Sequence, residues 1–182
     1  MSAPEGPLKQ TPLNAVHRQM GAKMVPFGGW DMPVQYRGIL DEHKAVRGAA
    51  GIFDVSHMGE VEFRGPAALD AVQRLTSNDA SRLQVGQVQY SALTTEAGTF
   101  VDDLTVYKFA DDHYIVTVNA SNIDKDFAWM RDHTKGNVEI RNQSDETALI
   151  AVQGPKAVEI LQKLTPLDLH AITYYWFARG KV

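Results

Sequence analysis

The sequence predicts an α+β protein made of two related subdomains, the second of them incomplete. Two observations lead to this fold class. Segments rich in β-branched and aromatic residues alternate with segments of helical periodicity. In addition, a strand–Gly–Pro–helix pattern occurs twice, in residues 62–76 and again in 151–165, at an offset of 89. The repeat indicates either two related subdomains or two strand-to-helix turns that arose independently. In each copy proline takes the first helical position, where its missing N–H is tolerated.

The N-terminal quarter contains two predicted helices around a packed loop. Residues 1–11 are rich in Pro, Gly and polar side chains and are expected to form a loose arm. Apolar spacing predicts a helix over 13–20 and a second, short helix over 38–49. Between them, residues 23–36 combine two prolines, a Gly-Gly pair and large apolar side chains. This composition favours a compact loop.

The remainder of the chain alternates strands and helices. Short connections predict antiparallel neighbours between residues 88 and 119. We therefore divide the chain into an N-terminal arm, helix and packed loop (1–52), a central subdomain (53–145) and the start of a truncated second subdomain (146–182). The predicted strands are 59–64, 88–95, 100–109, 114–119, 138–141 and 147–152, and the predicted helices are 66–76, 123–133 and 155–164.

Composition excludes several classes of protein. With 44% hydrophobic and 22% charged residues, the chain has enough apolar material for a core and is not disordered. A membrane span and a signal peptide are not expected. The absence of cysteine removes disulfides and thiolate sites and is compatible with the cytoplasmic location that we expect. A net charge of −4 argues against nucleic-acid binding.

Metal and hydrolase sites are not expected either. The six histidines are scattered, and no two of them lie three or four residues apart. Asp54, Ser56 and His57 lie close in sequence, but triad members normally come from distant segments.

The most informative segment is residues 100–107 (FVDDLTVY). Aspartate is depleted in strands, yet Asp102 and Asp103 stand in a row. Because successive side chains point to opposite faces, one carboxylate must face each way. One of them faces water or caps a turn, and the other sits in a cleft. The latter either accepts backbone N–H groups, a structural role, or holds a ligand N–H and offsets positive charge.

Neighbouring side chains extend this candidate site. Tyr90 and Asn119 lie in or after adjacent predicted strands and offer a flat ring and a versatile amide. Together with an aspartate they suit a planar heteroaromatic ligand, although each tyrosine taken alone could be a core residue. The aromatic segment 174–177 (YYWF) is either another core strand or part of the same pocket.

Three segments, in order and spacing, resemble one family. They are residues 23–30 (KMVPFGGW), 53–58 (FDVSHM) and 101–107 (VDDLTVY), supported by 60–66 (EVEFRGP) and 118–122 (VNASN). Together they closely resemble the T-protein family of the glycine cleavage system. Members of this family are aminomethyltransferases. The resemblance covers the chain from about Thr11 to its end.

The resemblance implies a fold, a reaction and a site. The chain would contain two related ferredoxin-like α/β subdomains of the T-protein folate-binding fold, the second incomplete. The substrate would be an aminomethyl group on the lipoyl arm of H-protein. Tetrahydrofolate would accept the one-carbon unit and ammonia would be released. The family's pocket aspartate matches Asp103, the candidate catalytic residue. The candidate folate-binding residues are Met58, Tyr90, Thr105, Tyr107, Asn119, Tyr174 and Tyr175.

The chain is much shorter than members of this family. We therefore expect an N-terminal portion that is inactive by itself, with exposed apolar surface around residues 174–177 that favours self-association. Three other readings stay open. They are a folate-binding relative acting in iron–sulfur cluster maintenance without transferase activity, the folate domain of a sarcosine or dimethylglycine dehydrogenase, and a non-enzymatic dimerisation module.

Overall fold

The computed structural model describes residues 6–182, which form two compact units. Unit 1 comprises the described residues up to His57 together with 148–170 and 180–182. Unit 2 comprises residues 58–147 and 171–179. The division into 1–52, 53–145 and 146–182 stays a prediction.

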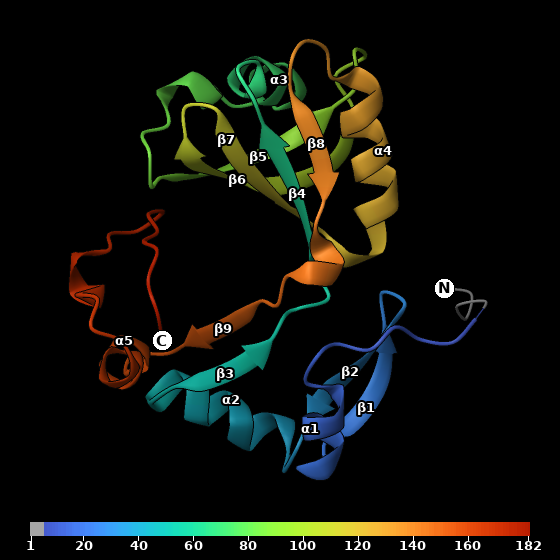
Figure 1. Ribbon diagram of the computed structural model, residues 1–182. Helices are drawn as coiled ribbons and strands as arrows, with labels where there is room; N and C mark the ends of the chain where they lie inside the picture. Colours follow the sequence, from blue (N-terminus) through green and yellow to red (C-terminus); the bar gives the residue numbers. More distant parts are fainter. Residues whose placement is uncertain (1–5) are drawn as a thin grey trace. The chain divides into compact units, whose positions relative to one another are not determined.

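Unit 2 is built on a five-stranded sheet in the order β5-β6-β7-β4-β8 (Figure 1). Every neighbouring pair of strands is antiparallel, which confirms the prediction for residues 88 to 119. The strands are β4 (Gly59–Arg64), β5 (Val88–Thr94), β6 (Phe100–Ala110), β7 (His113–Val118) and β8 (Glu139–Asn142).

Two helices cover one face of this sheet. They are α3 (Ala68–Leu75), which follows β4, and α4 (Ile123–His133), which follows β7. Both contribute to a single core with the inward side chains of the strands, among them Phe63 and Tyr114. The order β8-β4-β7-β6 with these two crossovers is the β-α-β-β-α-β ferredoxin-like arrangement, and β5 extends it at one edge. The predicted α+β fold class is confirmed.

Unit 1 contains a hairpin where the sequence predicts a packed loop. β1 (Lys23–Phe27) pairs with β2 (Trp30–Gln35), so the prediction for residues 23–36 is wrong. Gly28 and Gly29 both have positive φ, and they form a two-residue turn of the kind that joins antiparallel strands. The prolines misled the prediction, because a two-stranded sheet tolerates residues without an N–H along its edges.

The N-terminal segment is held against this hairpin. Lys9 N–H donates to Gly29 O at 2.9 Å, and Asp31 N–H donates to Lys9 O at 2.9 Å. The predicted loose arm is therefore wrong for Lys9, whereas residues 1–5 of that arm lie outside the described residues.

A second small sheet in unit 1 joins segments that are distant in sequence. β3 (Gly51–Asp54), which the sequence analysis missed, pairs antiparallel with β9 (Ile150–Gln153). The helices of this unit are α1 (Asn14–Gln19), α2 (Ile39–Gly48) and α5 (Ala157–Leu161). These agree with the predicted helices, although α5 is short and ends in a 3₁₀ turn. No helix within residues 6–182 is long and apolar enough to cross a membrane.

The two copies of the sequence repeat have the same local geometry. Gly65 follows β4 with φ 133°, and Gly154 follows β9 with φ 120°. Both values lie in the region that favours glycine. The packing of the following helices differs, since α3 is buried along one side whereas α5 contains no buried residue.

Gly154 is expected to be intolerant of any side chain. A Cβ atom there would lie 2.6 Å from the backbone oxygens of Ala49 and Val46, in addition to the strain of positive φ. We predict that Gly154→Ala lowers the free energy of unfolding by about 2–4 kcal/mol. Urea denaturation followed by circular dichroism measures this change.

Gly48→Ala is the matched control. Gly48 ends α2, and a Cβ atom there meets nothing within 4 Å. This variant should be unchanged or up to about 1 kcal/mol more stable. Equal stabilities for the two variants would contradict the account of the Gly154 turn.

Candidate functional site

The candidate site lies on the face of the unit 2 sheet opposite α3 and α4, which we call the second face. Because side chains alternate along each strand, this face receives the residues between the core positions. One row crosses four strands, since Tyr90 pairs with Thr105, Thr105 with Thr117, and Thr117 with Glu60. The row places a phenol, two hydroxyls and a carboxyl side by side.

The structure shows which aspartate faces which way. Leu104 and Val106 are buried in the core, so Asp102 shares the helix-covered face of β6 and Asp103 projects from the second face. Asp103 Oδ2 accepts a hydrogen bond from Tyr90 Oη at 2.7 Å. The expectation that one carboxylate points each way is therefore confirmed. Asp102 is the one on the helix-covered face, and Asp103 is the one on the second face.

Asn119, which directly follows β7, connects the two carboxylates. Its Nδ2 donates to Asp102 Oδ1 at 3.0 Å and to Asp103 Oδ1 at 2.9 Å. Asp102 also accepts from Asn122 Nδ2 at 2.9 Å and from the Asp103 N–H at 3.0 Å. Asp102 thus has the structural acceptor role, with its oxygens occupied by protein donors.

The electrostatics separate the two carboxylates further. Burial alone would raise the pKa of Asp102, but hydrogen bonds from Asp126, Asn122 and Asn119 outweigh burial and lower it. The hydrogen bond to Asp103 raises the pKa of Tyr90, which therefore stays a donor at neutral pH. An ionised carboxylate accepts about four hydrogen bonds, so Asp103, with its two side-chain donors, can still accept an N–H from a ligand.

Two of the predicted tyrosines lie close to this group. Tyr107 is on the same face of β6 as Asp103, with its ring 5.8 Å from that of Phe177. Val88, which pairs with Tyr107 in the sheet, donates its N–H to Tyr175 O at 2.8 Å. Tyr175 has φ 61°, an uncommon conformation for a side chain of its size.

Segment 174–177 does not form the core strand that was one expectation for it. It lies beside the start of β5, where Phe177 N–H donates to Gly86 O at 2.8 Å, but it makes only an isolated bridge. Tyr174 is 88% exposed and stacks edge-on against Tyr175. Tyr174 is therefore largely exposed to solvent, and none of the hydrogen bonds to Asp103 includes it.

Met58 lies at the edge of this group. It is partly buried in the bend before β4, where the pairing of Gly59 with Val118 brings it beside Asn119, but none of the hydrogen bonds to Asp103 includes it. Thr105, by contrast, stands in the cross-strand row beside Tyr90. The structure thus brings together Tyr90, Asp103, Thr105, Tyr107, Asn119 and Tyr175.

Glu60 is a second-face residue that the sequence analysis missed. Glu60 is only 5% exposed, and neither of its carboxyl oxygens has a hydrogen-bond partner among the described residues. Burial raises the pKa of Glu60 to about 7. The sequence offered one indication of this position, because Glu60 lies in a predicted strand and alternates with the core residues Val61 and Phe63.

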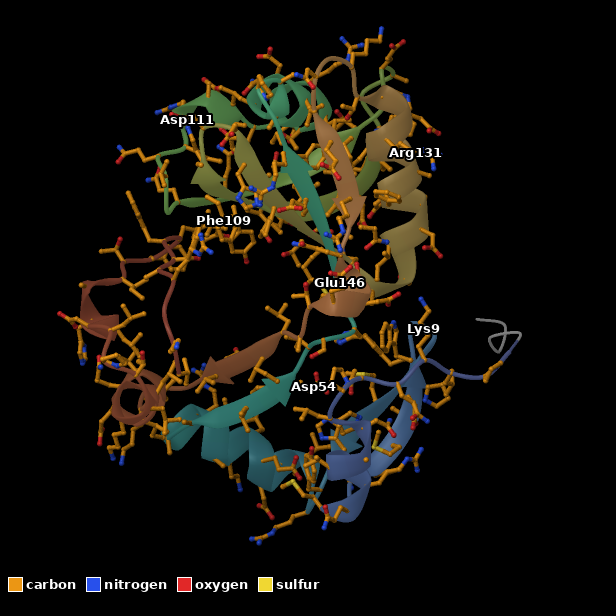
Figure 2. All side chains as sticks on the ribbon, in the orientation of Figure 1. Lys9, Asp54, Phe109, Asp111, Arg131 and Glu146 are labelled. Carbon is orange, nitrogen blue, oxygen red and sulfur yellow. The ribbon has the colours of Figure 1, made fainter. Side chains whose placement is uncertain are left out.

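The residues that superficially suggested a hydrolase form no triad. Ser56 Oγ donates to Leu149 O at 3.3 Å. Asp54, labelled in Figure 2, instead contacts His17 Nε2 through Oδ2 at 2.9 Å, and His17 Nδ1 lies 2.8 Å from Tyr36 Oη. These contacts connect β3 with α1 inside unit 1. Within residues 6–182 there is no group of three or more His, Asp or Glu side chains placed to hold a metal ion.

Comparison with known proteins gives consistent matches. The family described as the GCVT N-terminal domain matches residues 13–182. An aminomethyltransferase of Desulfitobacterium hafniense is 55% identical over 176 residues, covering 96% of this chain and 48% of that protein. One from Koribacter versatilis is 53% identical over 182 residues, covering 98% and 48%. The chain therefore spans about half the length of the curated relatives it matches.

Solved structures show the same fold. The glycine cleavage system aminomethyltransferase T from Bartonella henselae superposes with a TM-score of 0.83 at 33% identity, covering 93% of this chain and 46% of that one. A heterotetrameric sarcosine oxidase from Corynebacterium superposes with a TM-score of 0.51 at 15% identity, covering 89% and 69%, and shows likeness of fold alone.

Glu60 is expected to make stability depend on pH. Its pKa is about 7 in the folded chain against 4.5 as the ordinary value, so its contribution is present below pH 4.5 and is lost as pH rises through 7. We predict that the wild type loses up to about 3 kcal/mol of stability relative to Glu60→Gln between pH 4.5 and 8. Urea unfolding at a series of pH values measures it.

Glu62→Gln provides a control of opposite sign. Burial alone would raise the pKa of Glu62, but Arg64 and His113 outweigh burial and lower it. Its contribution is therefore present above its ordinary pKa and is lost as pH falls. If the two variants changed stability with pH in the same direction, the assignment of Glu60 would be wrong.

Proposed function

The chain belongs to the GCVT N-terminal domain family, and we propose that it supplies the folate-binding aspartate site of a glycine cleavage aminomethyltransferase. In this reaction the one-carbon unit of an aminomethyl group, carried on the lipoyl arm of H-protein, passes to tetrahydrofolate. Ammonia is released and reduced lipoyl H-protein remains. The proposal concerns the whole enzyme, of which this chain spans about half in the curated relatives.

The observation that carries the proposal is the group formed by Asp103, Tyr90 and Asn119. Asp103 is held from both sides, by the phenol of Tyr90 at 2.7 Å and the amide of Asn119 at 2.9 Å. A carboxylate fixed in this way is suited to a ligand N–H and to positive charge that develops beside it. Folate pterin rings carry several N–H groups around a planar edge.

The tasks of the side chains follow from their positions. Tetrahydrofolate supplies the nitrogen that receives the one-carbon unit. Asp103 holds a ligand N–H and stabilises positive charge as it develops on the reacting nitrogen and carbon. Tyr90 and Asn119 prevent the carboxylate from rotating away, which keeps the acceptor geometry fixed before the ligand binds.

The aromatic side chains provide the flat surfaces that a pterin requires. Tyr107 lies on the second face, Tyr175 is bonded through its backbone to Val88, the residue paired with Tyr107, and Thr105 offers a hydroxyl between Tyr90 and Thr117. Planar ligands bind such surfaces by stacking combined with hydrogen bonds at the ring edge. The roles of Met58 and Tyr174 in folate binding, H-protein as partner and the cytoplasmic location stay predictions.

Removing the charge of Asp103 is expected to weaken folate binding. We predict that Asp103→Asn raises the Kd for tetrahydrofolate at least about tenfold, because a hydrogen bond to a charged acceptor is replaced by a neutral one. Isothermal titration of the purified chain under anaerobic conditions measures the Kd.

Asp112→Asn, at an exposed position after β6, is the control and should leave the Kd within about twofold of the wild type. Comparable binding by the wild type and Asp103→Asn would exclude the assigned role of Asp103. Ammonia release from aminomethylated H-protein, assayed with tetrahydrofolate, tests the transferase reaction itself. Folate binding without ammonia release would restrict the proposal to a folate-binding domain.

Exposed apolar side chains suggest that the chain associates with itself. Tyr174 is 88% exposed, and Tyr175 and Trp176 beside it in the sequence are 39% and 36% exposed. Exposed aromatic side chains that lie together favour association. We predict dimers or larger species by light scattering at about 50 μM, in the range of modest interfaces, and their loss in Tyr174→Ser. A monomeric wild type at that concentration would contradict this expectation.

A further inference from the structure

A buried carboxyl that the proposed mechanism does not use lies behind the site. Asp126, in α4, is fully buried between the helix and the core. Neither of its oxygens accepts a hydrogen bond from any donor among residues 6–182. An ionised carboxylate without donors is strongly destabilised in such surroundings, and proteins normally avoid it by keeping the proton.

Two charged neighbours determine where that proton goes. Lys125 Nζ lies 3.4 Å from Asp126 Oδ1, but its side chain is half exposed, and the ammonium donates instead to Val101 O at 2.7 Å. Solvent therefore screens its effect on Asp126. The other neighbour is Asp102 on β6. Asn122, one turn before Asp126, donates to Asp102 Oδ2 at 2.9 Å, and Lys125 donates to Val101 O, so the start of α4 lies against this part of β6. Each of the two carboxyl groups shifts the pKa of the other. Two carboxyl groups at this range hydrogen bond only if one of them is protonated.

The hydrogen bonds of Asp102 indicate that the proton stays on Asp126. Asp102 already accepts from Asn119, Asn122 and the Asp103 N–H, so it serves as an ionised acceptor. Asp126 has no such donors. The pKa directions agree, because burial followed by the adjacent Asp102 raises the pKa of Asp126 to about 7, while hydrogen bonds outweigh burial and lower that of Asp102.

We propose that Asp126 is a positioning residue, which stays protonated and donates to Asp102 so that Asp102 aligns Asn119 with Asp103. The connection is short. The Asp126 O–H would donate to Asp102 as the proposed first step. Asp102 Oδ1 accepts from Asn119 Nδ2 at 3.0 Å, and the same Nδ2 donates to Asp103 Oδ1 at 2.9 Å. Its effect on folate rests on the proposed function, whereas the protonation of Asp126 does not.

The pair makes the site sensitive to pH. When Asp126 loses its proton, the hydrogen bond to Asp102 is lost and two like charges face each other between α4 and β6. The groups that titrate or carry charge at this point are Asp126 and Lys125 from α4 and Asp102 and Asp103 from β6. This repulsion moves Asp102, which still accepts from Asn119, and so shifts the Asn119 amide out of its alignment with Asp103.

The first experiment tests the proton directly in the 182-residue chain. Carbon-13 NMR follows the carboxyl signals of selectively labelled aspartates between pH 3 and 9. We expect one proton to leave the Asp102–Asp126 pair near neutral pH. If Asp126 titrates in the acid range, the proposal is wrong whether or not folate binds.

The second experiment separates positioning from packing. Asp126→Asn keeps a donor that can reach Asp102, Asp126→Leu keeps the volume without a donor, and Asp124→Asn is the exposed control. We expect the Asn119 side-chain amide signals to stay in place in Asp126→Asn and Asp124→Asn and to move in Asp126→Leu. Unmoved Asn119 signals in a folded Asp126→Leu would overturn the proposal. If Asp126→Leu does not fold, Asp126→Asn provides the test. Displaced Asn119 signals in Asp126→Asn would also overturn the proposal.

Folate affinity is the third readout. We expect the Kd of the wild type to rise from pH 6 to pH 8.5 and that of Asp126→Asn to rise at least threefold less, since an amide loses no proton. Equal pH profiles would overturn the positioning role. If the wild type binds no folate at any pH, the proposed function fails, and the two NMR measurements still decide the role of Asp126.

Discussion

The two-residue period of β6 is the constraint on which the candidate site depends. It sends Asp102 to the helix-covered face and Asp103 to the second face, so that adjacent residues of one type receive opposite environments. A shift of one residue in the pairing of β6 would exchange them and would also expose Leu104 and Val106. The burial of those two side chains therefore fixes the orientation of Asp103.

Asn119 can contact both aspartates because it directly follows β7, which pairs with β6. A single amide nitrogen contacts a carboxylate from each face, which connects the interior of unit 2 with its second face. Asp102 accepts hydrogen bonds from three donors, two side-chain amides and one backbone N–H, whereas Asp103 keeps acceptor positions free. A structural aspartate and the proposed ligand-binding aspartate can thus be neighbours without competing for the same partners.

Buried carboxyls occur on both faces of the same sheet. Asp126 lies on the helix side and Glu60 on the second face, and burial raises the pKa of each to about 7. Both are placed by elements whose apolar residues build the core, α4 through Ile123 and Met130 and β4 through Val61 and Phe63. Apolar packing therefore holds two carboxyl groups in surroundings that disfavour their ionised forms.

Local patterns in the sequence determined most of the elements. The alternation of apolar residues predicted the strands of unit 2, helical spacing predicted α3 and α4, and the Gly-Pro pairs predicted both strand-to-helix turns. These signals act over a few residues and need no distant partner. The hairpin of β1 and β2 was within reach of the same reasoning, because Gly28 and Gly29 suit its turn, but the prolines hid it.

Tertiary structure alone decided the rest. β3 is four residues long and pairs with β9 from the far end of the chain, so no local pattern marks it. The face of each aspartate, the amide that joins them and the burial of Asp126 and Glu60 depend equally on which strands become neighbours. The sequence by itself determined that two carboxylates point apart in a strand. Only the packing of α4 against one face of the sheet decided which of them faces the helices.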